Sequence, residues 1–194
     1  MQRSYRKKRR RKGSAEKIHR PGLVLTVRAR PANPHQGLIN VGGAVLPCAL
    51  GKGGITAAKR EGDGRTPLAA MRVLSGYFRA DGFAAARRTR LAMAPIGPAL
   101  GWCEVPADRN YNRPVRMPYG ASHERMRRDD HLYDVCLVLD WNVRPRRRNR
   151  GSAIFFHLAR PGLAPTEGCV AVSRATMRRL LPWLSKESVV KVVR

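Results

Sequence analysis

A histidine and a cysteine twelve positions apart are the residues of this chain best suited to covalent chemistry. His157 lies near the end of the apolar run 152–159, and Cys169 directly follows a glycine, Gly168. A thiol attacks as its thiolate, and a neighbouring imidazole generates that thiolate by accepting the proton. Gly168 permits a tight turn, and the adjacent N–H groups of Gly168 and Cys169 form a candidate oxyanion hole. The spacing suggests a cysteine nucleophile with a histidine base.

The same two residues also fit a structural role. A lone histidine and a lone cysteine fall this close in many chains, and a histidine after three apolar residues is compatible with a buried, hydrogen-bonded side chain. On spacing alone, the structural interpretation is favoured. Of the four cysteines, Cys48 and Cys136 lie inside apolar runs and are expected in the core, while disulfide pairing stays open. No Cys/His cluster has zinc-ligand spacing, so no metal site is expected.

The elements that must position His157 and Cys169 are mostly strands. One helix is expected from Ser173, which can act as its N-cap, to the vicinity of Pro182, which ends or kinks it. Strands and helices do not alternate, which argues against a doubly wound parallel sheet and predicts a mainly β fold. Alternating or short apolar runs predict strands at 22–30, 71–80, 133–141, 152–159, 169–172 and 188–193, and two strands within 37–50 around the turn Gly42-Gly43.

Residues 81–130 are irregular and rich in Gly, Pro, Asn and Arg. A loop region of this length in a compact domain is usually functional, so it is expected to form a wall or lid over a groove. Tyr111, Asn112, Arg113 and His123 are its candidates for substrate contact. A loop-structuring or solvated role for each of the four is an equal alternative.

The formal net charge of +26 is unevenly distributed along the 194 residues, although the chain is basic even without its first 20 residues. Residues 1–20 contain ten Lys or Arg and one Glu, which predicts a disordered basic tail before a single domain at 21–194. Such charge implies a polyanionic partner: nucleic acid, anionic lipid or an acidic cell-wall polymer. Aromatic residues make up only 6% and do not interleave with the basic clusters, which argues against nucleic acid. Neither a membrane span nor an apolar signal-peptide region is visible.

The residues around His157 and Cys169 favour a catalytic role for the two over a structural one. A histidine at a strand end, followed by Thr166-x-Gly168-Cys169, resembles the catalytic motif of the L,D-transpeptidase catalytic domain, or YkuD, family. Segment 60–73 looks like the family's upstream G…TP segment, which precedes a strand, and segments 108–119 and 151–173 look like those of a compact, basic bacterial subgroup. The resemblance covers residues 23–194. It implies a β-sandwich or open barrel with one late helix and long loops.

The resemblance also implies an activity. Cys169 would attack the amide between an L-centre and a D-centre of a peptidoglycan stem peptide, and the acyl group would pass to an amine, as in cell-wall cross-linking. His157 would be the base and later the acid, the N–H groups of Gly168 and Cys169 would hold the oxyanion, and Thr166 would lie near substrate. Metal and organic cofactors would not be needed. Carbapenems are expected inhibitors, and the periplasm or cell envelope is the expected location, by an export route that the sequence does not reveal.

Two alternatives stay open. An L,D-carboxypeptidase or endopeptidase on the same scaffold would pass the acyl group to water, and a non-catalytic, basic polyanion-binding protein would use neither residue. This chain also has Glu167 where many family members have a second histidine. A carboxylate pointing inward would raise the thiol pKa, so Glu167 is expected to point outward.

Overall fold

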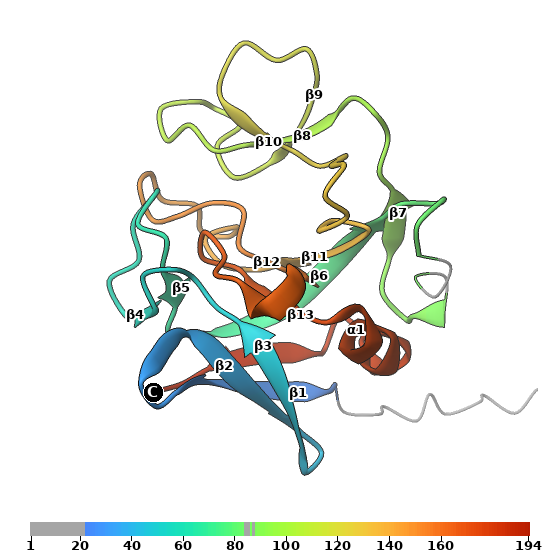
Figure 1. The fold of residues 1–194 in the computed structure, drawn as a ribbon. Coiled ribbons are helices and arrows are strands. Elements are labelled where there is room, and N and C mark those ends of the chain that lie inside the picture. The colour runs from blue at the N-terminus through green and yellow to red at the C-terminus, as the bar shows by residue number, and fades with distance from the viewer. Residues whose placement is uncertain (1–21, 84–85, 87) are drawn as a thin grey trace, which may run out of the picture.

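Most strands of the chain join one large sheet that curls into a barrel-like body (Figure 1). The structure, a computed structural model, describes residues 22–83, 86 and 88–194, so the tail predicted at 1–20 lies outside the described residues. Within the described residues the sheet has nine strands in the order β11-β12-β13-β3-β2-β1-β14-β6-β7. They are β1 (Val24–Arg30), β2 (Asn33–Val41), β3 (Ala44–Ala49), β6 (Ala70–Phe78), β7 (Met93–Pro95), β11 (Val135–Leu139), β12 (Phe155–Leu158), β13 (Val170–Val172) and β14 (Val189–Val192).

The barrel closes because β11 pairs with two strands. It is antiparallel to β12 on one side and to β6 on the other. Alternating side chains such as Leu25 and Val27 on β1 point inward and are fully buried. The expected mainly β, barrel-like fold class is confirmed.

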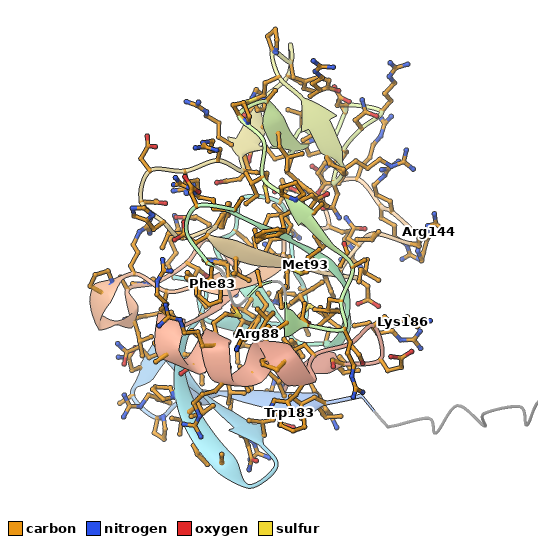
Figure 2. The ribbon with its side chains drawn as sticks, turned by 90° about the vertical axis from the view of Figure 1, so that its right-hand side faces the viewer. Phe83, Arg88, Met93, Arg144, Trp183 and Lys186 are labelled. Atoms are coloured by element: carbon orange, nitrogen blue, oxygen red, sulfur yellow. The ribbon has the colours of Figure 1, made fainter. Side chains whose placement is uncertain are left out.

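The late helix covers one side of the barrel. Helix α1 (Arg174–Leu180) begins after Ser173, whose hydroxyl accepts a hydrogen bond from the Thr176 N–H, as predicted for an N-cap. The 3₁₀ turn η3 (Leu181–Trp183) follows, with Pro182 at its start. Figure 2 shows α1 with Phe83 on one side and the exposed Trp183 at its C-terminal end. Within the described residues, no helix is long and apolar enough to cross a membrane.

Residues 81–130 are more regular than the sequence indicates. Besides β7 they contain β8 (Leu100–Cys103), β9 (Pro114–Arg116) and β10 (His123–Arg125), which form a separate small sheet in the order β10-β8-β9. Figure 1 shows this sheet above one end of the barrel. Its strands are only three or four residues long, too short for a clear alternation of apolar residues. Two two-residue strands, β4 (Ile55–Thr56) and β5 (Thr66–Pro67), lie within the segment 51–69.

Candidate functional site

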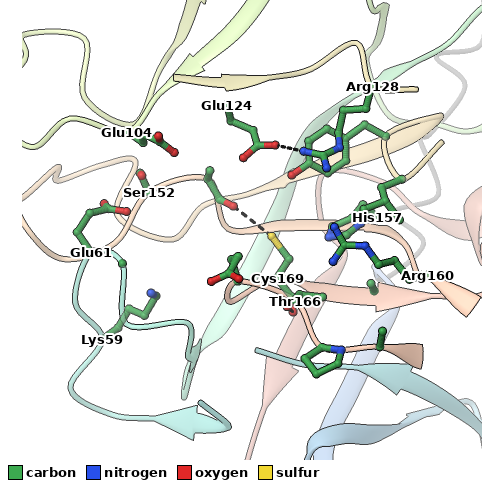
Figure 3. Close-up of a pocket in the computed structure, with 18 residues that line it drawn as sticks. Lys59, Glu61, Glu104, Glu124, Arg128, Ser152, His157, Arg160, Thr166 and Cys169 are labelled. Carbon is green, nitrogen blue, oxygen red and sulfur yellow. Dashed lines mark hydrogen bonds and ion pairs between the residues drawn. The ribbon is translucent and has the colours of Figure 1, made fainter. Parts of the chain in front are cut away.

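The sheet register brings His157 and Cys169 into one cavity. Strands β12 and β13 are parallel neighbours in which His157 lies opposite Ala171. Cys169 is two residues before Ala171, and side chains two apart on a strand point to the same face. His157 and Cys169 therefore face the same side of the sheet, and both line a cavity of about 300 Å³ (Figure 3). The loop between them contains the 3₁₀ turn η2 (Pro161–Leu163).

The Cys169 thiol is buried and held by two backbone groups. Its sulfur accepts a hydrogen bond from the Phe155 N–H at 3.3 Å and donates to the Ala153 carbonyl at 3.2 Å. Burial raises the thiol pKa to about 12, although the Phe155 N–H acts in the opposite direction. The resting group is therefore a protonated thiol. The other three cysteines are also buried and free, and Cys48 and Cys136 lie in the core as predicted.

The His157 imidazole is oriented by a main-chain carbonyl. Its Nδ1 lies 2.8 Å from the Leu158 oxygen, a contact that places the proton on Nδ1 and leaves Nε2 as the acceptor. The Tyr133 ring packs edge-on against it, with the centroids 5.1 Å apart. Burial lowers the His157 pKa to about 4, although the Leu158 carbonyl acts in the opposite direction. Near neutral pH the site holds a neutral thiol and a neutral imidazole.

The turn before Cys169 depends on Thr166 and Gly168. The Thr166 hydroxyl donates to the Cys169 carbonyl at 2.7 Å and accepts from the Gly168 N–H at 3.1 Å. Gly168 has φ 135°, and a Cβ atom there would lie 2.9 Å from the Arg65 carbonyl oxygen. Glycine is therefore required at position 168 for both reasons.

The hydrogen bonds of this turn correct the predicted oxyanion hole. Because the Gly168 N–H is committed to Thr166, it is not free to hold an oxyanion in this conformation. The Cys169 N–H makes no hydrogen bond within the described part of the chain, so it remains a candidate donor. Thr166 lines the cavity, but its hydroxyl stabilises the turn.

The four loop residues predicted to touch substrate do not line the cavity. Tyr111 and Asn112 are buried, and their side chains bind other parts of the protein. Asn112 Oδ1 accepts from the Trp102 indole and from the Ala153 N–H, both at 3.0 Å, so it holds the peptide unit next to the thiol. Arg113 is exposed, and His123 is half-buried with Nδ1 against the Ala121 carbonyl.

The residues that do wall the cavity come from segments far apart in the sequence. Glu104, Glu124 and Arg128 belong to 81–130, so this region does supply a wall, as expected. Lys59 and Glu61 come from the segment before β6, and Arg160 follows His157. None of these six was predicted as a site residue from the sequence. The scarcity of glutamate, with six in a chain of charge +26, is the one signal that marks three of them, Glu61, Glu104 and Glu124.

Glu167 points outward, as expected. Its side chain is 77% exposed and forms an ion pair with Lys52 at 2.8 Å. An exposed carboxylate with its own cation is screened by solvent. Its contribution to the thiol pKa is accordingly small beside that of burial.

The buried neutral imidazole makes folding stability depend on pH. An unfolded His157 takes up its proton near its ordinary pKa of 6.5, whereas the folded residue does so only near 4. Between these values the unfolded state binds more protons, so stability is lost as pH falls, by up to about 3 kcal/mol from this residue. Urea unfolding from pH 7 to 4 should show a steeper loss in the wild type than in His157→Gln. If the free energy of unfolding fell equally with pH in the two proteins, the lowered pKa of His157 would be contradicted.

The comparison with known families agrees with this geometry. The sequence profile of the YkuD family, described as the L,D-transpeptidase catalytic domain, matches residues 35–192. Neither a curated protein nor a solved structure matches the chain significantly. The profile covers most of the described barrel together with His157, Thr166, Gly168 and Cys169. The chain therefore belongs to the L,D-transpeptidase catalytic-domain family.

Proposed function

We propose that this protein is a peptidoglycan L,D-transpeptidase of the cell envelope that uses Cys169 as nucleophile and His157 as base. One observation carries the proposal: Cys169 and an imidazole with a free Nε2 line the same cavity in a family member. Acyl transfer from an amide needs such a nucleophile with a base to activate it.

The resting protonation states define the first half-reaction. Because the thiol and imidazole are both neutral, the sulfur–hydrogen bond must break as the sulfur attacks the carbonyl carbon. Nε2 of His157 takes the proton, and the carbonyl oxygen becomes an oxyanion, which the Cys169 N–H can receive. When the tetrahedral intermediate collapses, the departing amine takes the proton from Nε2, and a thioester remains on Cys169.

The second half-reaction runs the same steps in reverse. An acceptor amine attacks the thioester carbon and gives its excess proton to Nε2 of His157. Collapse expels the Cys169 sulfur, which recovers the proton from the imidazolium. A new amide joins the two stem peptides. Water in place of the amine would give a trimmed stem, which is the hydrolase alternative.

The products of a muropeptide reaction test the proposal. With a disaccharide tetrapeptide as the substrate, we expect a cross-linked dimer together with one released D-amino acid per dimer, seen by liquid chromatography and mass spectrometry. A trimmed monomer without dimer would instead assign hydrolysis. Unchanged substrate, together with an unmodified Cys169 peptide after carbapenem treatment, would contradict both activities and favour the polyanion-binding alternative.

A further inference from the structure

The cavity gathers most of the chain's glutamates although the protein is strongly basic. Four of the six glutamates in the chain line it, namely Glu61, Glu104, Glu124 and Glu167. Two of these carboxylates are already neutralised, because Glu124 pairs with Arg128 and Glu167 pairs with Lys52. The other two require a separate explanation.

Glu61 and Glu104 have only neutral hydrogen-bond partners. Glu61 accepts a hydrogen bond from the Tyr111 phenol, and Glu104 accepts a hydrogen bond from the Ser122 hydroxyl at 2.6 Å. Among the described residues neither carboxylate lies in an ion pair. The nearby ammonium of Lys59 does not neutralise them, since it is bound to Asp63 at 2.5 Å and to the Arg60 carbonyl at 2.8 Å.

A third acceptor at the same end of the cavity, the Ser152 hydroxyl, has no hydrogen-bond partner in the described structure. Ser152 is only 7% exposed, and its hydroxyl makes no hydrogen bond of acceptable geometry in the described structure, although the Tyr111 phenol lies nearby. A buried hydroxyl without a partner is destabilising, so such groups usually mark a missing ligand or water. Figure 3 shows Ser152 between Glu61 and Glu104, at the end of the cavity away from His157.

Three convergent acceptors and two uncompensated negative charges match one chemical group. A primary ammonium has three N–H donors and one positive charge. We propose that Glu61, Glu104 and Ser152 form a subsite for a primary ammonium group on the peptide that acylates Cys169. The inference rests on the proposed function, and it adds a cationic amine as a requirement of the donor substrate.

This ammonium is distinct from the amine that attacks the thioester. Two carboxylates stabilise the protonated form of a bound amine, and a protonated amine has no lone pair for attack. The base that would deprotonate an attacking amine, His157, lies at the other end of the cavity (Figure 3). The subsite therefore recognises and orients the donor while the reaction proceeds at Cys169.

Equilibrium binding tests the subsite without turnover. Full-length Cys169→Ala protein is titrated calorimetrically with two probes: a stem tetrapeptide with a free side-chain amine, and the same peptide with that amine acetylated. We expect the free amine to bind roughly tenfold tighter or more, the effect of losing a charge-assisted hydrogen bond. Adding Glu104→Gln or Ser152→Ala should reduce this ratio. Glu167→Gln is the matched control, because Glu167 already has Lys52, and it should leave the ratio unchanged.

Equal affinity for the two probes, or no binding of either, would overturn the subsite. So would a ratio that Glu104→Gln and Ser152→Ala both leave intact. Turnover of the free-amine peptide by the wild type is measured separately. Tighter binding of the free-amine probe without turnover would reject the proposed function and retain the subsite. Turnover with equal affinities for the two probes would support the proposed function and reject the subsite.

Discussion

Cys169→Ala is expected to lower peptide turnover at least about 10³-fold, to the level left by substrate binding alone. The sulfur forms the covalent intermediate, and no other group in the cavity replaces it: the remaining cavity-lining nucleophiles are Lys59, which is bound to Asp63, and hydroxyls such as Ser152. The variant should also lose its mass increase on incubation with a carbapenem. Muropeptide analysis and intact-protein mass spectrometry measure the two effects.

A second cysteine provides the control for this variant. Cys103 is buried in β8 and does not line the cavity, so Cys103→Ala should keep both turnover and acylation. Circular dichroism should show that Cys169→Ala remains folded, since it loses only two hydrogen bonds of the thiol. A folded Cys169→Ala protein with wild-type turnover would exclude this residue as the nucleophile.

His157→Gln is expected to slow Cys169 acylation by about 10²- to 10⁴-fold, the usual contribution of a general base. In the wild type the acylation rate should be nearly constant from about pH 5 to about pH 9, because neutral imidazole and neutral thiol dominate between their pKa values of about 4 and about 12. Below that range protonation of His157 removes the base, and the rate falls. Stopped-flow measurement of carbapenem acylation against pH checks both statements.

An acylation rate that changes near neutral pH would indicate different resting protonation states of His157 and Cys169. A rate that rises through pH 6 to 7 would mean that His157 titrates near its ordinary pKa. Water would then reach His157 and Cys169 in solution, and burial would not lower the His157 pKa. His123→Gln is the matched control, because His123 lies outside the cavity and should leave rate and profile unchanged. A wild-type rate in folded His157→Gln would remove this residue from the mechanism.

Local sequence patterns predicted most of the barrel. The runs at 22–30, 133–141, 152–159 and 188–193 contain β1, β11, β12 and β14, and the run at 71–80 covers all of β6 except its first residue. Each presents buried apolar side chains over a strand length. The cap at Ser173 and the end near Pro182 were predictable for a similar reason, since both depend on neighbouring residues. The small sheet β10-β8-β9 was not predictable in this way, because its three short strands are defined by pairing with one another.

The roles of Tyr111 and Asn112 show the limit of this reasoning. Both lie in a polar segment typical of an exposed loop, yet each is at most 3% exposed. The Asn112 side chain makes four hydrogen bonds, to Trp102, Trp141, Asn142 and Ala153, and the partners other than Trp102 are more than 25 residues away in sequence. A polar side chain that is satisfied by distant backbone groups leaves no local pattern.

The sequence by itself determined the fold class, because each strand run has a local pattern of apolar residues. It also determined the family motif and the identity of the candidate nucleophile and base, because these depend on residues within one short segment. The tertiary structure alone decided the protonation states of His157 and Cys169, since burial depends on everything packed around them. It also decided which hydrogen-bond acceptors meet in the cavity, because Glu61, Glu104 and Ser152 come from three separate segments. Electrostatic and desolvation effects act through space, so they follow the fold and not the order of residues along the chain.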